Sequence, residues 1–233
     1  MVNDFSSVKW SYSRASQFIT LAQNSTAGTP LDIWFPATPN VKPQTGDQFA
    51  LGYFRNFAQN MYEMSAEIYY KSFHNLVDFR DPAQLFLNPY LEGELRIGKG
   101  YSYGIETLIR KNQGRFGGWI SYSYSRSFRI VPEINGGRVY NSPYDKPHNV
   151  NVVASYDVSK RISASLTWIY ATGLPVTFPT GRAVVGNAVI PIYSDRNAYR
   201  MPDYHRLDVS ITLKGKEKPG RKWQSELNLS VYN

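Results

Sequence analysis

The stretch Phe116-Gly-Gly-Trp-Ile-Ser-Tyr-Ser-Tyr-Ser-Arg-Ser-Phe-Arg-Ile130 alternates between two kinds of side chain. One set of alternate positions is apolar or aromatic and consists of Phe116, Ile120, Tyr122, Tyr124, Phe128 and Ile130. The other set is mostly small or polar and consists of Gly117, Ser121, Ser123, Ser125, Ser127 and Arg129, with Trp119 among them. Successive side chains of a β-strand point to opposite faces, so the pattern predicts one long strand with an apolar face and a polar face.

The same alternation recurs along the whole chain. Between residues 61 and 73 the even positions carry Tyr62, Met64, Ala66, Ile68 and Tyr70, whereas the odd positions include Glu63, Ser65, Glu67 and Lys71. Nine strands are predicted in all, over residues 8–21, 47–57, 61–73, 99–110, 116–130, 149–157, 161–170, 206–214 and 223–231. Several are longer than the five or six residues common in globular proteins, and about ten residues of tilted strand cross a bilayer.

Short and long connections take turns between these strands. The short ones are Gln59-Asn60, residues 112–115, Ser159-Lys160 and residues 215–221, and the long ones are residues 23–44, 76–92, 131–146 and 173–203. Short turns on one side and long loops on the other are typical of barrels in the bacterial outer membrane. The polar face is rich in Ser, Asn, Thr and Gly, which fits a hydrated interior. The predicted fold is therefore all-β, an antiparallel transmembrane β-barrel.

A soluble β-sandwich is the alternative, because apolar faces that meet in a core explain the alternation equally well. It does not explain why long loops fall on every second connection. Closed bacterial barrels have even strand numbers, and an open edge in a bilayer leaves backbone groups without partners. With nine strands and no signal peptide at the N-terminus, we expect the chain to be an incomplete segment of a larger exported protein.

The composition excludes several kinds of protein. The chain has no cysteine, so it can form neither a disulfide nor a thiolate nucleophile. Its net charge of +8 comes with no nucleic-acid-binding motif, and much of it lies in or beside the short connections, as at Lys214, Lys216, Lys218, Arg221 and Lys222. The three histidines are far apart and no nucleophile–base pair emerges. We therefore expect no enzyme, no metal, no cofactor and no nucleic-acid partner.

Several phrases in the sequence carry a family resemblance. They are Gln17-Phe18, Pro30-Leu-Asp-Ile-Trp-Phe-Pro36, Val41-Lys-Pro-Gln44, Glu67-Ile-Tyr-Tyr-Lys71, Gly98-Lys-Gly-Tyr-Ser-Tyr-Gly-Ile-Glu106, Gly118-Trp-Ile-Ser-Tyr122 and Tyr199-Arg-Met-Pro-Asp-Tyr-His-Arg-Leu-Asp208. In this order they resemble the C-terminal part of the barrel of TonB-dependent outer-membrane receptors, particularly those of Bacteroidetes-type bacteria. The resemblance implies that residues 1–233 are a partial β-barrel, namely the C-terminal part of a 22-stranded barrel, with the plug domain and the final strand absent.

The resemblance also implies a function. Such a receptor takes up a scarce nutrient, for example a siderophore, cobalamin or a glycan, using energy delivered through TonB. The implied partners are outer-membrane lipid, the plug domain and remaining strands, the TonB complex through the missing N-terminal part, and a small nutrient ligand. The implied location is the outer membrane of a Gram-negative cell. A passive porin, an adhesin-like barrel and a soluble carbohydrate-binding sandwich stay open as alternatives.

Two sets of residues are candidates for the functional site. Aromatic side chains in the long loops could stack on sugars or planar chelates, or pack loop against loop: Trp34, Phe35, Phe86, Phe178 and Tyr193. Polar side chains are expected to face the lumen at Glu63, Glu67, Lys71, Arg129, Arg206 and Asp208.

Charge pairing is the expected role of most of these polar residues. Glu63 and Glu67 lie about 13 Å apart by strand rise, too far for a glycosidase pair, so we expect salt bridges with Lys71 and Arg129. The mixed charges Asp195, Arg196, Arg200, Asp203, Arg206 and Asp208 are expected to brace a loop and to pair in the lumen.

Overall fold

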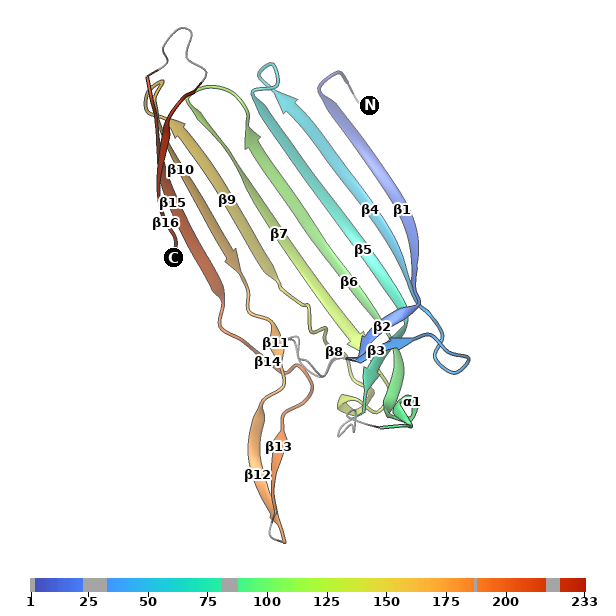
Figure 1. Cartoon of the computed structure of the whole chain (residues 1–233). Coiled ribbons are helices and arrows are strands. Elements are labelled where there is room, and N and C mark those ends of the chain that lie inside the picture. The colour runs from blue at the N-terminus through green and yellow to red at the C-terminus, as the bar shows by residue number, and fades with distance from the viewer. Residues whose placement is uncertain (1–2, 23–32, 81–87, 187, 217–222) are drawn as a thin grey trace.

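The structure is a computed structural model that describes residues 3–22, 33–80, 88–186, 188–216 and 223–233. Within them, nine strands follow one another in a single antiparallel sheet (Figure 1). The bounds, in sheet order, are β1 Ser6–Gln17, β4 Gln44–Phe57, β5 Tyr62–Phe79, β6 Leu95–Lys111, β7 Phe116–Ile130, β9 His148–Asp157, β10 Ile162–Ala171, β15 Tyr204–Lys214 and β16 Glu226–Val231. The short β8, Tyr140–Asn141, pairs with the end of β7. Each of these nine strands overlaps one that the alternation predicts, which confirms the all-β antiparallel fold. The segment predicted as one strand over residues 8–21 is divided, because β1 ends at Gln17 and Ile19–Ala22 forms the separate strand β2.

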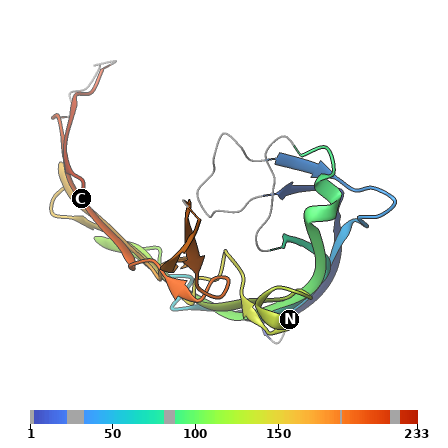
Figure 2. The same cartoon turned by 90° about the horizontal axis from the view of Figure 1, so that it is seen from below.

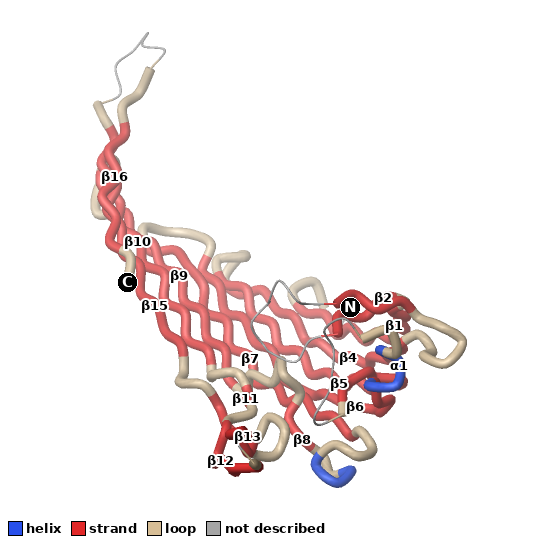
Figure 3. The backbone as a smooth tube through the Cα atoms, turned by 60° about the horizontal axis from the view of Figure 1, so that its bottom comes forward, coloured by secondary structure: helices blue, strands red, loops and turns tan. Residues whose placement is uncertain are grey.

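The sheet is one curved layer, as the views in Figures 2 and 3 show. Register places apolar side chains of neighbouring strands side by side on one face, for example in the row Met64, Ile109, Ile120, Val152, Trp168 and Leu207. This face stays open: Trp10 is 79% exposed and Leu229 is 70% exposed. Among the described residues no second sheet covers it. A sandwich would bury these side chains, so that alternative is wrong.

A β-bulge explains why the predicted bounds are wrong near one end of β5 and β6. The register shifts between His74 and Leu76, and Asn75 adopts a left-handed conformation with φ +56°. The extra residue reverses the alternation, so Leu76 and Asp78 lie on the same face as Phe73. Both strands continue, to Phe79 in β5 and back to Leu95 in β6, through residues predicted as loop.

Successive connections lie alternately at the two opposite ends of the strands (Figure 1). At one end of the strands are tight turns, and Ala58, Gln59 and Asn60 all have positive φ there. The opposite ends of the strands, which we call the loop edge, carry most of the remaining elements. They are β2 Ile19–Ala22 paired with β3 Ile33–Pro36, α1 Leu91–Glu94, a 3-10 turn at Asn135–Gly137, β11 Pro175–Val176 paired with β14 Tyr199–Arg200, and the hairpin of β12 Pro179–Val185 with β13 Ala188–Tyr193.

Apart from Ala50 in β4, the buried apolar side chains of the described residues lie at or near the loop edge. One cluster joins Val41, Val77, Phe79 and Leu95, with Phe35 packed against it. A second cluster joins Val131, Ile134 and Tyr140. The loops therefore have small cores of their own, which hold them in place above the sheet.

No helix in the described part of the chain is both long enough and apolar enough to cross a membrane.

Candidate functional site

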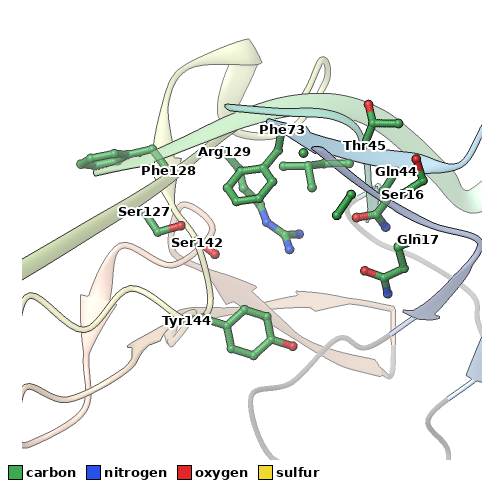
Figure 4. A pocket seen from close by; sticks show the side chains of 13 residues that line it. Ser16, Gln17, Gln44, Thr45, Phe73, Ser127, Phe128, Arg129, Ser142 and Tyr144 are labelled. Carbon is green, nitrogen blue, oxygen red and sulfur yellow. The ribbon is translucent and has the colours of Figure 1, made fainter. Parts of the chain in front are cut away.

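An open cavity of about 430 Å³ lies on the polar face of the sheet, next to the loop edge. Figure 4 shows Arg129, Gln17, Gln44 and Tyr144 around the same open space. They come from β7, β1, β4 and the segment after β8. One cation, neutral amides and aromatic surface together suit a small polar or anionic molecule.

Arg129 is held in this cavity by Asp78, whose side chain is only 8% exposed. The Arg129 Nη1 atom lies 3.4 Å from Asp78 Oδ2. The same carboxylate accepts a hydrogen bond from Arg196 Nη1 at 2.8 Å and one from the Tyr140 hydroxyl at 2.6 Å. The bulge at Asn75 puts Asp78 on the polar face, where these three donors can reach it. A buried carboxylate with several donors is a stable anchor, because its charge is compensated.

Asp145 is the second buried anchor, with a fully buried side chain. It accepts hydrogen bonds from the Ser127 amide at 2.7 Å and from Arg126 Nε at 3.3 Å, and it forms a close ion pair with Arg200. Arg200 also donates to the carbonyl oxygen of Gly173 at 3.0 Å. Asp145 therefore ties β14 to β7.

Further hydrogen bonds join the loop after β7 to the loop before β15. Asn135 accepts from the Arg196 amide at 2.7 Å, and the Asn197 side chain donates to the Asn141 carbonyl oxygen at 2.8 Å. Arg138 pairs with Asp195 at 2.8 Å. Together with the two buried anchors these contacts form what we call the loop network. They confirm the predicted loop bracing by Asp195, Arg196 and Arg200.

Tyr140 and Asp203, both at the loop edge, have shifted pKa values. Burial raises the pKa of the Tyr140 hydroxyl, and the nearby Asp78 carboxylate raises it further. The pKa of Asp203 is lowered because its carboxylate accepts hydrogen bonds from the Tyr170 hydroxyl and from the Gly173 amide. At neutral pH the first group is therefore a donor and the second an acceptor.

The structure distributes the predicted loop aromatics over separate elements. Trp34 in β3 is 65% exposed, whereas Phe35 packs against the buried cluster around Phe79. Phe178 lies edge-on to Tyr199 at 6.1 Å, and Tyr193 is opposite Pro179 at the base of the β12–β13 hairpin. Phe86 lies outside the described residues. A ligand-binding role for these aromatics stays a prediction, and Phe35 has a packing role.

The predicted lumen residues all occupy the polar face, but the expected pairs differ. Glu63 lies 3.7 Å from Arg110 rather than beside Lys71, and Arg129 pairs with Asp78. Glu67 is opposite Glu106 on the neighbouring strand. The Lys71 ammonium lies 5.0 Å from the centre of the Tyr69 ring. Arg206 pairs with Asp208 two residues along its own strand, at 2.9 Å.

Sequence reasoning missed Asp78 and Asp145 as the anchors of the loop network. Asp78 stands between Val77 and Phe79, and a lone carboxylate among apolar residues indicates a buried charge with partners. The partners could not be read from the sequence, since Arg196 is 118 residues away.

In the described ranges, no three His, Asp or Glu side chains gather closely enough to hold a metal ion.

Comparison with known proteins gives the family. No curated protein matches the chain. Among solved structures, it is similar to the ferric-catecholate import receptor Fiu from E. coli K12, with TM-score 0.60, 15% identity, and coverage of 98% of this chain and 29% of Fiu. It is also similar to the FrpB iron transporter from Neisseria meningitidis, with TM-score 0.58, 10% identity, and coverage of 100% of this chain and 33% of FrpB.

At these identities the likeness shows the fold, and the chain spans about a third of the length of each protein. Fiu is named as a receptor and FrpB as a transporter, and neither is named as an enzyme. The family model described as TonB dependent receptor-like, beta-barrel, matches residues 1–233. The chain therefore belongs to the family of TonB-dependent receptor-like β-barrels, whose members sit in the outer membrane.

Proposed function

We propose that this chain is part of the barrel wall of an outer-membrane receptor that takes up a scarce nutrient with energy delivered through TonB. Family membership supports the receptor class. The observation that carries the membrane location is the exposed apolar face shared by the strands of the sheet. In water such a face would drive association, whereas hydrocarbon accepts it.

The height of this apolar face fits a bilayer. On the apolar face of β6, Lys99 and Lys111 stand at the two ends of a stretch that contains Tyr101, Tyr103, Ile105, Thr107 and Ile109. Twelve residues of strand rise by about 40 Å, which a tilt near 45° reduces to about 28 Å. The apolar band of such barrels is about 25 Å tall. The hydroxyl of Thr107 donates to the Tyr122 carbonyl oxygen at 3.2 Å, so it adds no unpaired polar group to the band.

The orientation and the place in the barrel are part of the proposal. The loop edge faces outward and the tight turns face the periplasm, as in other outer-membrane barrels. The sheet is open, with β1 and β16 at its edges, and a bilayer requires partners for their backbone groups. These partners are the remaining strands of a 22-stranded barrel of Bacteroidetes type. The nine strands are then the thirteenth to the twenty-first, and the plug domain and the final strand lie outside this chain.

The ligand is proposed to meet the receptor at the loop edge. Trp34, Phe178 and Tyr193 expose aromatic surface there, and the cavity around Arg129 offers polar groups. A siderophore, cobalamin or a glycan can use both kinds of contact. An iron chelate is the first class to test, since Fiu is named for ferric catecholate and FrpB for iron.

The test is uptake by cells that make the full-length receptor. Labelled ferric siderophore, cobalamin and oligosaccharides are offered to cells with and without its gene. We expect one class to depend on the gene and its uptake to stop when an uncoupler collapses the proton gradient. Gene-dependent uptake that survives the uncoupler would indicate a passive porin, and adhesion without uptake would indicate an adhesin-like barrel. A receptor recovered in buffer without detergent would contradict the membrane proposal.

A further inference from the structure

An imidazole and an ammonium group lie opposite each other on the apolar face of the sheet, where β5 and β6 approach the loop edge. His74 is the register partner of Lys99, and Lys99 is also opposite Ile130 of β7. Both side chains are exposed. Among the described residues neither has a carboxylate within ion-pair distance, whereas Arg14, near the same edge on β1, has Asp47 at 3.8 Å. The charge of the Lys99 ammonium is therefore available for an external anion, and the His74 ring opposite it can donate a hydrogen bond to the same anion.

A cavity of about 340 Å³ lies between these two side chains. Ile97, Ile130 and Pro132 form apolar walls, and Gly98 contributes backbone without a side chain. The bulge at Asn75 interrupts the pairing of β5 with β6 at this point, and bulges bend the strand that carries them. The cavity thus combines positive charge with apolar surface, which suits an amphiphile with an anionic head.

From His74 and Lys99 toward the middle of the strands, the face changes in the order found across a lipid leaflet. Tyr101 and Tyr103 are two and four residues from Lys99, and their rings lie 5.2 Å and 6.4 Å from that of Phe128. Ile105 follows farther toward the middle of the strand. Cations favour anionic headgroups and aromatic rings favour the interface, so from Lys99 toward the middle of the strand the order is headgroup, interface, hydrocarbon.

We propose that His74, Lys99 and the apolar walls between them bind a lipid of the outer leaflet that carries a phosphate group and a net negative charge. The Lys99 ammonium and a ring N–H of His74 donate to the phosphate oxygens, as basic groups do to anionic headgroups. The acyl chains run along Ile97 and Ile130 toward the tyrosines. This inference rests on the proposed function, because only a receptor in the outer membrane meets that leaflet.

The test is lipid retention by the full-length receptor, purified in detergent from outer membranes and examined by native mass spectrometry. Phosphatidylglycerol and phosphatidylcholine are added separately. We expect the wild type to retain phosphatidylglycerol in preference to phosphatidylcholine. The double variant His74→Gln with Lys99→Gln should retain about tenfold less phosphatidylglycerol than the wild type. Lys71→Gln is the matched control, because Lys71 is a cation on the opposite face of β5. Lys99→Gln alone should show a smaller loss and serves if the double variant does not fold.

The results separate the lipid site from the proposed function. A receptor absent from the outer-membrane fraction would overturn both. A receptor present there whose double variant, or Lys99→Gln variant, retains phosphatidylglycerol as well as the wild type would overturn the lipid site and leave the proposed function standing. Equal losses in Lys71→Gln would also overturn it, since retention would then depend on total charge.

Discussion

Replacing Leu166 by arginine tests the face that each strand presents to lipid. Leu166 is near the centre of β10, between Ala154 of β9 and Val209 of β15 on the apolar face. An arginine at the bilayer midplane of a barrel costs about 2–4 kcal/mol on the lipid side. At 1.4 kcal/mol per decade, the folding equilibrium should fall by about 30-fold to 700-fold.

Ser165→Arg is the matched control, one residue away and on the opposite face. The Ser165 hydroxyl lies 2.6 Å from the Ser210 hydroxyl, so the change to arginine removes one hydrogen bond, worth about 1 kcal/mol. The assay is denaturant unfolding of the full-length receptor in lipid vesicles, followed by tryptophan fluorescence. Leu166→Arg should cost clearly more than Ser165→Arg. Equal costs, or a larger cost for Ser165→Arg, would refute the assignment of the apolar face to lipid.

Three further substitutions probe the loop edge of the same full-length receptor. Tyr140→Phe removes the hydroxyl that donates to Asp78 and should cost about 1.5–3 kcal/mol in denaturant unfolding. Because the pKa of Tyr140 is raised, this contribution is complete below the ordinary tyrosine pKa of about 10 and is lost as the pH rises beyond it. The two unfolding energies should therefore converge in alkaline buffer, and a constant difference would contradict the assignment. Asp145→Asn leaves two partly buried arginines facing a neutral amide, so limited proteolysis should cut the loops before the sheet, and an unchanged digest would exclude an anchoring role. Gly173→Ala places a methyl group against the Met201 carbonyl oxygen and should lower the free energy of unfolding by about 1–3 kcal/mol, whereas a neutral effect would show that the loop can shift.

Alternation alone was enough to predict the strands. In β7 most positions follow period two, with Trp119 and Arg126 as exceptions, and the predicted and observed bounds agree at both ends. At β5 the same rule stopped too early, because one extra residue at Asn75 reverses the pattern. A bulge leaves little trace in a single sequence beyond a residue that tolerates positive φ.

The candidate site was less predictable than the strands. The sequence marked Arg196 and Arg200 as bracing residues, but their partners depend on which loops meet above the sheet. The pairing of Glu63 with Arg110 follows from register, which the sequence alone leaves open. Of the aromatic residues, Phe35 was indistinguishable from Trp34 in sequence, yet only Phe35 has a buried cluster beside it.

The pairing of each strand with its sequence neighbours has a consequence for assembly. Hairpins joined by tight turns cost little chain entropy, so the wall can be added one hairpin at a time. The bond between Arg196 and Asp78 is different, since it links residues 118 apart. It closes only after the strands from β5 to β15 stand side by side. A probe of that single contact would therefore report when insertion of this part of the receptor is complete.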